Sequence, residues 1–235
     1  MVGIAVALSV IVLWLVSLAY ALTQIEVHRF IDFIPHLGWL LWIQLLYVGL
    51  FITAHDACHG TVAPGRTRVN LWIGRVAAFL YAGFYFDHLV VKHLAHHQNV
   101  GKKDDPDFHS LRPGYHGFFY WILRFFWNYL TVRQLILMSA IAQCLMHGVH
   151  LPEANVLGFW VLPAVLSALQ LFFFGTYLPH RIQGSACFPD RHHARNLPLP
   201  RWMSFVSCFH FGAYHHDHHL KPGVPWYSLP TKCHF

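Results

Sequence analysis

Charged side chains are scarce in this sequence. Lysine, arginine, aspartate and glutamate make up 11% of its 235 residues, whereas an ordinary soluble domain carries roughly 25%. Hydrophobic residues account for 56% of the chain and aromatic residues for 17%. This composition excludes a disordered chain and a soluble globule, and it indicates a membrane protein. The length suits about four spans of roughly 20 residues each and one extramembrane region.

Several motifs with well-defined chemistry are also missing. The five cysteines contain no C-x-x-C pair, so neither a zinc knuckle nor a disulfide framework is indicated, and we interpret them as reduced thiols. Without H-E-x-x-H, a zinc protease would lack its general base. The Glu-x-x-His pattern of carboxylate-bridged di-iron bundles does not occur. Hydride-cofactor chemistry is not implied either, because G-x-G-x-x-G is absent.

Long apolar runs predict an all-α integral membrane protein that forms a single domain over residues 1–235. We expect four transmembrane helices, interfacial helices and a cytoplasmic histidine-rich cap. The predicted spans are Val2–Leu22, Leu37–Ala54, Gln134–Val149 and Val156–Leu178. Two further stretches are short or contain an arginine, so interfacial or re-entrant helices fit them better: Leu71–Phe86 and Gly117–Leu130.

The basic residues lie on one side of this layout. Arg29 is the single basic residue between the first two spans, and residues 151–155 contain none. All other lysines and arginines lie between His55 and Arg133 or after Leu178. By the positive-inside rule, that side and both termini are predicted to be cytoplasmic. The scattered basic residues match no nucleic-acid-binding module, although a docking surface for an acidic electron-transfer protein remains an alternative.

Histidine is unusually abundant, with 21 residues against 16 lysines and arginines. Three histidine boxes lie on the basic side, at residues 55–59 (HDACH), 93–97 (HLAHH) and 215–219 (HHDHH). Histidines spaced i, i+3 and i+4 share one helical face, so neighbouring imidazoles can reach one metal ion. A single buried histidine is more often a hydrogen-bonded core residue, but three boxes together favour metal ligation. Metal binding also removes the cost of clustered protonation.

The number of imidazoles bears on the kind of metal site. Eight exceed the four positions of a tetrahedral zinc site and suit two ions of higher coordination number. Imidazole binds iron, copper, zinc and nickel, so ligand type alone leaves the metal open.

The boxes resemble those of the membrane fatty acid desaturase/hydroxylase superfamily, and the flanking segments resemble the beta-carotene ketolases within it. The similar stretches span most of the chain and lie at residues 49–57 (GLFITAHDA), 59–64 (HGTVAP), 105–109 (DPDFH), 174–181 (FGTYLPHR), 210–212 (HFG), 214–219 (YHHDHH) and 224–226 (VPW). The boxes alone specify the superfamily, whereas the flanking segments at residues 53–56 (TAHD) and 176–181 (TYLPHR) narrow the resemblance to the ketolases. The resemblance implies a membrane fatty-acid-desaturase-like domain with two iron ions.

The resemblance also implies a set of metal-binding residues. These are His55, His59, His93, His96, His97, His215, His218 and His219, with His180 as a ninth. A simple alternative for His180 is a histidine favoured by the negative end of a helix dipole. Desaturases often carry Asn where this chain has Thr176, so a ligand there, direct or through water, stays open. Further residues could orient the imidazoles by accepting their second N–H: Asp56, Asp105, Asp107, His216 and Asp217.

The chemistry implied by the resemblance is O2-dependent oxidation at C4 of a beta-ionone ring. Two successive hydroxylations and loss of water would give the ketone, converting beta-carotene to echinenone and then canthaxanthin. Electrons would come from an external donor such as ferredoxin. Because a carotenoid dissolves only in the bilayer, the site must open towards lipid. The aromatic stretches Phe79–Phe86 and Phe118–Trp127 could wall the entry, although an interfacial aromatic belt explains each residue equally well.

Two alternatives remain at this stage. One is another enzyme of the superfamily, either a carotenoid C3 hydroxylase or a fatty acyl desaturase or hydroxylase. The other is a non-catalytic membrane haem or metal protein. Bis-histidine haem requires two facing histidines rather than adjacent pairs, which disfavours the haem protein.

Overall fold

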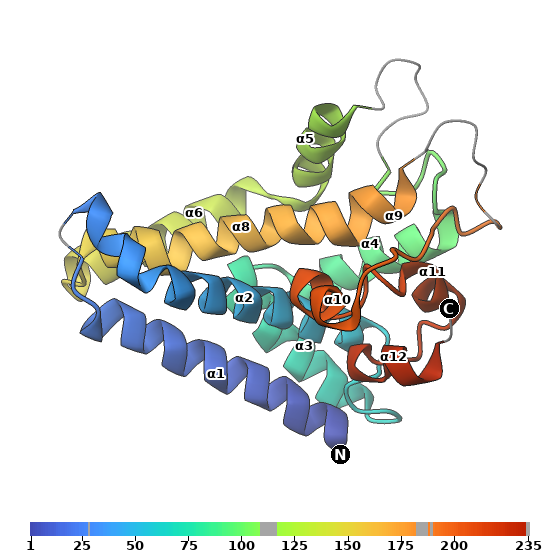
Figure 1. The fold of residues 1–235 in the computed structure, drawn as a ribbon, viewed down its shortest axis with the longest axis horizontal. Helices are drawn as coiled ribbons and strands as arrows, with labels where there is room; N and C mark the ends of the chain where they lie inside the picture. Colours follow the sequence, from blue (N-terminus) through green and yellow to red (C-terminus); the bar gives the residue numbers. More distant parts are fainter. Residues whose placement is uncertain (28, 109–116, 182–187, 189, 234–235) are drawn as a thin grey trace.

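The computed structural model describes residues 1–27, 29–108, 117–181, 188 and 190–233, and it contains helices but no strands within these ranges (Figure 1). Of the cysteines, Cys187 lies outside the described residues, and the other four are free thiols. The helical segments in chain order are α1 (Val2–Gln24), η1 (Phe30–His36), α2 (Leu37–Cys58), α3 (Thr67–Ala82), α4 (Phe86–Asn99), α5 (Phe118–Tyr129), α6 (Val132–Gln143), η2 (Cys144–Gly148), α7 (Glu153–Asn155), η3 (Val156–Val161), α8 (Leu162–Leu171), η4 (Phe172–Tyr177), α9 (Leu178–His180), α10 (Arg201–Cys208), α11 (His215–Leu220), η5 (Trp226–Ser228) and α12 (Leu229–Lys232).

Three straight helical stretches are long and apolar enough to cross a membrane. They cover Val2–Gln24, Ile31–Cys58 and Glu153–His180. The last stretch runs continuously from α7 to α9, and two of its segments, η3 and η4, are π-helical. Such π turns inside long helices are frequent at functional sites, and η4 leads directly to His180. Large apolar side chains of α1, such as Leu8 and Val16, are exposed, as expected for contact with lipid.

Two helix pairs are sharply bent. The axes of α3 and α4 differ by 97°, and those of α5 and the α6–η2 helix differ by 81°. The first bend occurs at Gly83, whose φ of +65° is readily adopted by glycine. The second follows Leu130, where Thr131 caps α6 through the backbone N–H of Gln134. The buried Gln134 side chain reaches the carbonyl of Ala82, so the two bends contact each other.

The core lies around α2, which packs against α1, α3 and α8 (Figure 1). Tyr47 on α2 is fully buried, and the Trp14 ring of α1 packs edge-on against it at 5.2 Å. At the opposite end from the histidines, Asn155 donates hydrogen bonds to the carbonyls of Ala21 and Ile25. These contacts fix α1, α2 and the 153–180 helix as one bundle.

The observed helices agree in part with the four predicted spans. Three spans correspond to the straight helices, whereas the third, Gln134–Val149, belongs to a bent pair together with α5. The ambiguous stretches 71–86 and 117–130 form helices that end at the bends. The short helices α10, α11 and α12 lie together at one end of the bundle, where they form the predicted histidine-rich cap (Figure 1).

Candidate metal centre

The first histidine box ends the central helix. His55 lies in the last turn of α2, and His59 is the residue directly after the helix, still with helical backbone angles. The backbone N–H of His59 donates to the carbonyl of His55, so the i, i+4 spacing holds. Their ring centroids lie 5.0 Å apart. Both imidazoles therefore leave the cap end of the bundle on the same side.

The second box lies on α4, which crosses the end of α2 because of the 97° bend. The rings of His93 and His97 approach the first box, with centroids 4.7 and 4.8 Å from that of His59. His96, one position before His97, is 3% exposed and points to a different group of histidines. The second box therefore contributes to two places.

The third box forms the short helix α11. Phe209 and His210 precede it with positive φ angles of 47° and 72°, so the chain reverses after α10 and directs α11 towards the other boxes. Within α11, the His218 ring lies 4.7 and 5.0 Å from the rings of His55 and His59. The rings of His215 and His219 instead lie 4.6 and 5.3 Å from that of His180. The His215, His218 and His219 side chains are all buried.

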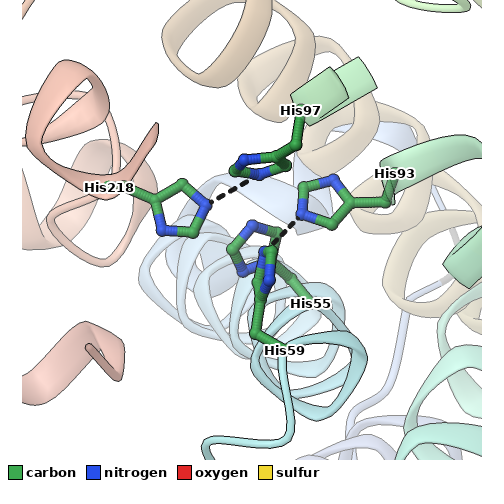
Figure 2. Close-up of side chains that lie close together, drawn as sticks. All are labelled: His55, His59, His93, His97 and His218. Carbon is green, nitrogen blue, oxygen red and sulfur yellow. Dashed lines mark hydrogen bonds between the residues drawn. The ribbon is translucent and has the colours of Figure 1, made fainter. Parts of the chain in front are cut away.

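Five histidines form the first cluster, which Figure 2 shows converging from α2, α4 and α11. One ring nitrogen of each lies within 4.8 Å of the others. The closest pairs are His59 Nε2 and His93 Nε2 at 2.7 Å, and His97 Nε2 and His218 Nε2 at 3.2 Å. We call this group the five-histidine cluster: His55, His59, His93, His97 and His218.

Four further histidines form a second group with the same internal limit of 4.8 Å. His215 Nε2 lies 2.7 Å from His180 Nε2 and 3.0 Å from His219 Nε2. His180 is the last residue of α9, so the 153–180 helix supplies a histidine that belongs to no box. We call this group the four-histidine cluster: His96, His180, His215 and His219.

The two clusters are neighbours. The ring centroids of His97 and His219, one from each cluster, are 4.3 Å apart. Nine imidazole nitrogens exceed the coordination number of a single metal ion. The two adjacent clusters therefore fit two metal ions better than one.

The arrangement of nitrogens fits metal ions. Around an ion with metal–nitrogen bonds of roughly 2.0–2.1 Å, neighbouring ligand nitrogens lie about 3 Å apart, and the Nε2 contacts above range from 2.7 to 3.2 Å. Without an ion, ring nitrogens that face one another in groups of four and five could not all be paired. A bound cation satisfies all of them at once.

Two imidazoles are fixed by hydrogen bonds from their other nitrogen. His96 Nδ1 lies 2.8 Å from Asp105 Oδ1, and His180 Nδ1 lies 2.8 Å from the carbonyl oxygen of His193. Each acceptor holds a proton on Nδ1, so in the neutral ring Nε2 is unprotonated and directed into the four-histidine cluster. This is the usual arrangement of metal-binding histidines. Burial acts to lower the pKa of His96, but Asp107 and Asp105 raise it to about 8, so metal binding must release the second proton of that ring.

Burial also favours the neutral form of the histidines that metal binding requires. It lowers the pKa of the His215, His218 and His219 imidazoles well below the ordinary value, and the surrounding histidines lower it further. These rings are therefore uncharged at neutral pH and present lone pairs without a protonation cost.

Comparison with known proteins identifies the family of this chain. The profile of the fatty acid desaturase family, described as "Fatty acid desaturase", matches residues 32–145 and 127–232. A beta-carotene ketolase from Paracoccus sp. (strain N81106 / MBIC 01143) is 42% identical over 95% of this chain and 88% of its own length. The chain belongs to the beta-carotene ketolase group of the fatty acid desaturase family. No solved structure matches it significantly.

Two further relatives with ketolase names come from other sources. A second beta-carotene ketolase, from Paracoccus sp. (strain PC1), is 41% identical over 97% of this chain and 91% of its own length. A protein named zeaxanthin 4-ketolase from Chlamydomonas reinhardtii is 35% identical over 98% of this chain and 53% of its own length.

Two of the carboxylates predicted to orient the imidazoles, Asp105 and Asp107, lie beside His96 and differ in their pKa. Asp105 contacts His96, and its neighbour Asp107 has Oδ2 3.8 Å from the same Nδ1. Burial raises the pKa of Asp107 to about 6, although His96 opposes the shift. Burial also acts to raise the pKa of Asp105, but His96 and the hydrogen bonds of the loop bring it below the ordinary value. Asp105 is therefore ionised at neutral pH and ready to accept the His96 proton.

The remaining candidates have other partners. The Asp56 carboxylate lies 3.6 Å from His55 Nδ1, too far for a hydrogen bond, and instead accepts one from the backbone N–H of Trp226. Asp217 accepts a hydrogen bond from Asn196, and His216 contacts Asp190, so both point to the segment before α10. Thr176 is buried in the wall of the cavity that contains the histidines.

Three contributors were not predicted from the sequence. The His193 carbonyl that fixes His180 is a backbone atom of an irregular segment and carries no sequence signal. Tyr129, whose hydroxyl donates to Asp107, and Trp226, whose N–H donates to Asp56, are distant in sequence from their partners. The aromatic stretch 118–127 and the VPW segment indicated these regions, but not these contacts.

Proposed function

We propose that this chain is a di-iron, O2-dependent membrane oxygenase with beta-carotene 4-ketolase activity. It converts beta-carotene to echinenone and then canthaxanthin by two successive hydroxylations at C4 of the beta-ionone ring, followed by dehydration to the ketone. The observation that carries the proposal is the pair of adjacent histidine clusters in a chain 42% identical to a named beta-carotene ketolase. Eight box histidines and His180 would hold the two irons.

The irons would supply reductive activation of dioxygen and removal of hydrogen from the allylic C4–H bond. The protein's own residues hold the histidine nitrogens in place, exclude water and position C4. A second hydroxylation at the same carbon gives a geminal diol, which loses water to form the ketone. Each round needs an electron pair from outside the chain, for which we propose a ferredoxin-type donor that docks on the basic cytoplasmic face.

The proposed membrane arrangement has four crossings. Besides the three straight helices, the 132–148 helix would cross, because it leads towards the end of the bundle opposite the cap (Figure 1). The cap, the metal centre and both termini would then lie on the basic side, which the positive-inside rule makes cytoplasmic.

A substrate cavity adjoins the histidines. An apolar cavity of 370 Å³ lies between α2, α3, α5 and α8. Both aromatic stretches expected to wall an entry contribute to it, with Tyr81 and Phe84 from one and Phe125 from the other. Val165 and Leu169 line it and are 51% and 39% exposed, so it reaches the lipid-facing surface. Its volume lies within the roughly 300–1,000 Å³ of ligand sites and suits one cyclic end group.

Filling this cavity is expected to block the reaction. Ala168 on α8 lines the apolar cavity, and Ala168→Phe would occupy the space of the ring. We expect keto-pigment to fall at least about fivefold, since overfilling a fitted site costs typically 1–3 kcal/mol. The matched control is Leu162→Phe, on the exposed surface of the same helix. Equal pigment yields from the two variants, at equal protein level and metal content, would place the substrate elsewhere.

Pigment analysis tests the proposed function directly. Expression in a bacterium that produces beta-carotene is expected to yield echinenone and canthaxanthin, separated by chromatography. A C3 alcohol instead would identify a carotenoid hydroxylase, and altered acyl chains with unchanged carotenoids would identify a fatty acyl enzyme. A haem Soret band in the purified protein, with no change of pigment, would favour the non-catalytic alternative.

A further inference from the structure

Three cavities meet at one residue, Tyr129, the last residue of α5. It lines the apolar cavity and a smaller cavity of 80 Å³ that contains the histidines. It also lines a cavity of 690 Å³ at the two helix bends, whose wall includes Lys92 and Arg133. Phe125 and Leu171 are shared by the first two cavities only, so Tyr129 occupies the junction of all three.

The Tyr129 hydroxyl leads towards the metal centre. It donates a hydrogen bond to Asp107 Oδ1. Asp107 in turn donates its backbone N–H to Asp105 Oδ1 at 2.9 Å, the same oxygen that lies 2.8 Å from His96 Nδ1. The tyrosine is therefore connected to a histidine of the four-histidine cluster through Asp107, by its carboxylate and its backbone N–H, and through the Asp105 carboxylate.

Two neighbouring side chains hold the Tyr129 ring. The Phe125 ring packs against it with centroids 4.7 Å apart, and the Lys92 ammonium lies 5.1 Å from its centroid. A cation over a phenol ring and an offset aromatic neighbour both restrict its rotation. The hydroxyl consequently reaches Asp107 from one fixed direction.

We propose that Tyr129 is a positioning residue that separates the substrate cavity from the metal centre and, through Asp107 and Asp105, holds the His96 imidazole in its metal-binding orientation. This inference rests on the proposed function and deepens it. It assigns two separable tasks to one side chain. The ring shapes the substrate cavity, and the hydroxyl supports the metal site.

The test is Tyr129→Phe, which keeps the ring and removes the hydroxyl. Iron affinity, measured by competition with a chelator in detergent, is expected to fall about threefold to tenfold. Losing a direct partner of a metal-binding histidine costs roughly 10–100-fold in affinity. We expect a smaller loss here because Tyr129 acts on His96 indirectly, through Asp107 and Asp105. Beta-carotene binding to the metal-free protein, followed by tryptophan fluorescence, is expected to stay within about twofold. Tyr85→Phe, which removes a hydroxyl from the 690 Å³ cavity, should change neither.

A second variant tests whether the effect passes through Asp107. Asp107→Ala removes the same hydrogen bond from its other partner, and we expect it to weaken iron binding by at least the same factor. Adding Tyr129→Phe to it should then cost nothing further, because coupled residues are not additive. Full additivity, or unchanged iron affinity in Tyr129→Phe, would overturn the inference. Wild-type protein that binds iron but forms no ketone would instead sink the proposed function alone.

Discussion

Replacing His218 with alanine is expected to abolish keto-carotenoid formation while leaving the protein in the membrane. His218 is 1% exposed, and its ring lies 4.7 Å from that of His55 on α2 and 4.9 Å from that of His97 on α4. Losing an orienting partner of a metal-binding residue costs roughly 10–100-fold in affinity or activity, so losing a metal-binding imidazole should cost more than about 100-fold. Canthaxanthin should fall below detection.

The matched control for this variant is His216→Ala in the same helix. The His216 imidazole contacts Asp190 at 2.9 Å on the outside of the cap, so its loss should leave pigment formation in place. Pigments from beta-carotene-producing cells, iron content of the purified protein and the amount of membrane-inserted chain measure the outcome. Persistent canthaxanthin in His218→Ala, at normal protein level, would contradict the proposed role of the cluster.

The convergence of the boxes was predictable from sequence, but their division was not. The i, i+3, i+4 spacing places the histidines of each box on one helical face. The predicted topology places all three boxes on the same, basic side of the membrane. The allotment of His96 to one cluster and of its neighbour His97 to the other depends on how α4 crosses α2. That crossing is set by the 97° bend, a tertiary property that no spacing rule contains.

Hydropathy likewise predicted the long helices better than the bent ones. A straight apolar run such as 2–24 is visible as a continuous stretch. A bend depends on the backbone at one or two residues. Gly83 permits the left-handed turn, but a glycine within an apolar stretch indicates several structures. A Cβ at this position would lie 3.2 Å from the Met138 sulfur of α6, a contact that the sequence does not reveal.

The orienting groups were the least predictable part of the site. Asp56, Asp105, Asp107 and Asp217 all lie in or near a box, and proximity along the chain does not distinguish them. In the structure, Asp105 contacts a cluster histidine at hydrogen-bond distance, because the turn after α4 returns its carboxylate to the helix. Its two oxygens also accept the backbone N–H groups of Gly101 and Asp107, which fixes the carboxylate before any metal binds.

Asp105 therefore gives a second prediction with a large effect. Asp105→Ala removes the acceptor that holds the proton on His96 Nδ1, and the ring loses both its orientation and the tautomer with a free Nε2. Metal affinity and keto-pigment yield are expected to fall roughly 10–100-fold. The neighbouring Asp104 is exposed, so Asp104→Ala serves as the matched control with a nearly unchanged yield.

Asp105→Asn tests whether His96 needs a hydrogen-bond acceptor at this position or only a side chain of the same shape. The amide fills the same space, and when its oxygen accepts from Gly101 its NH2 group faces His96 Nδ1 and the backbone N–H of Asp107. The NH2 group then loses the Asp107 hydrogen bond and can satisfy His96 Nδ1 only as a donor, which shifts the proton to Nε2. We expect this variant to lose about as much metal affinity as Asp105→Ala, while its thermal unfolding stays closer to that of the wild type. Wild-type iron binding in Asp105→Asn would mean that the carboxylate supports the loop alone, and that the tautomer of His96 is set by the metal itself.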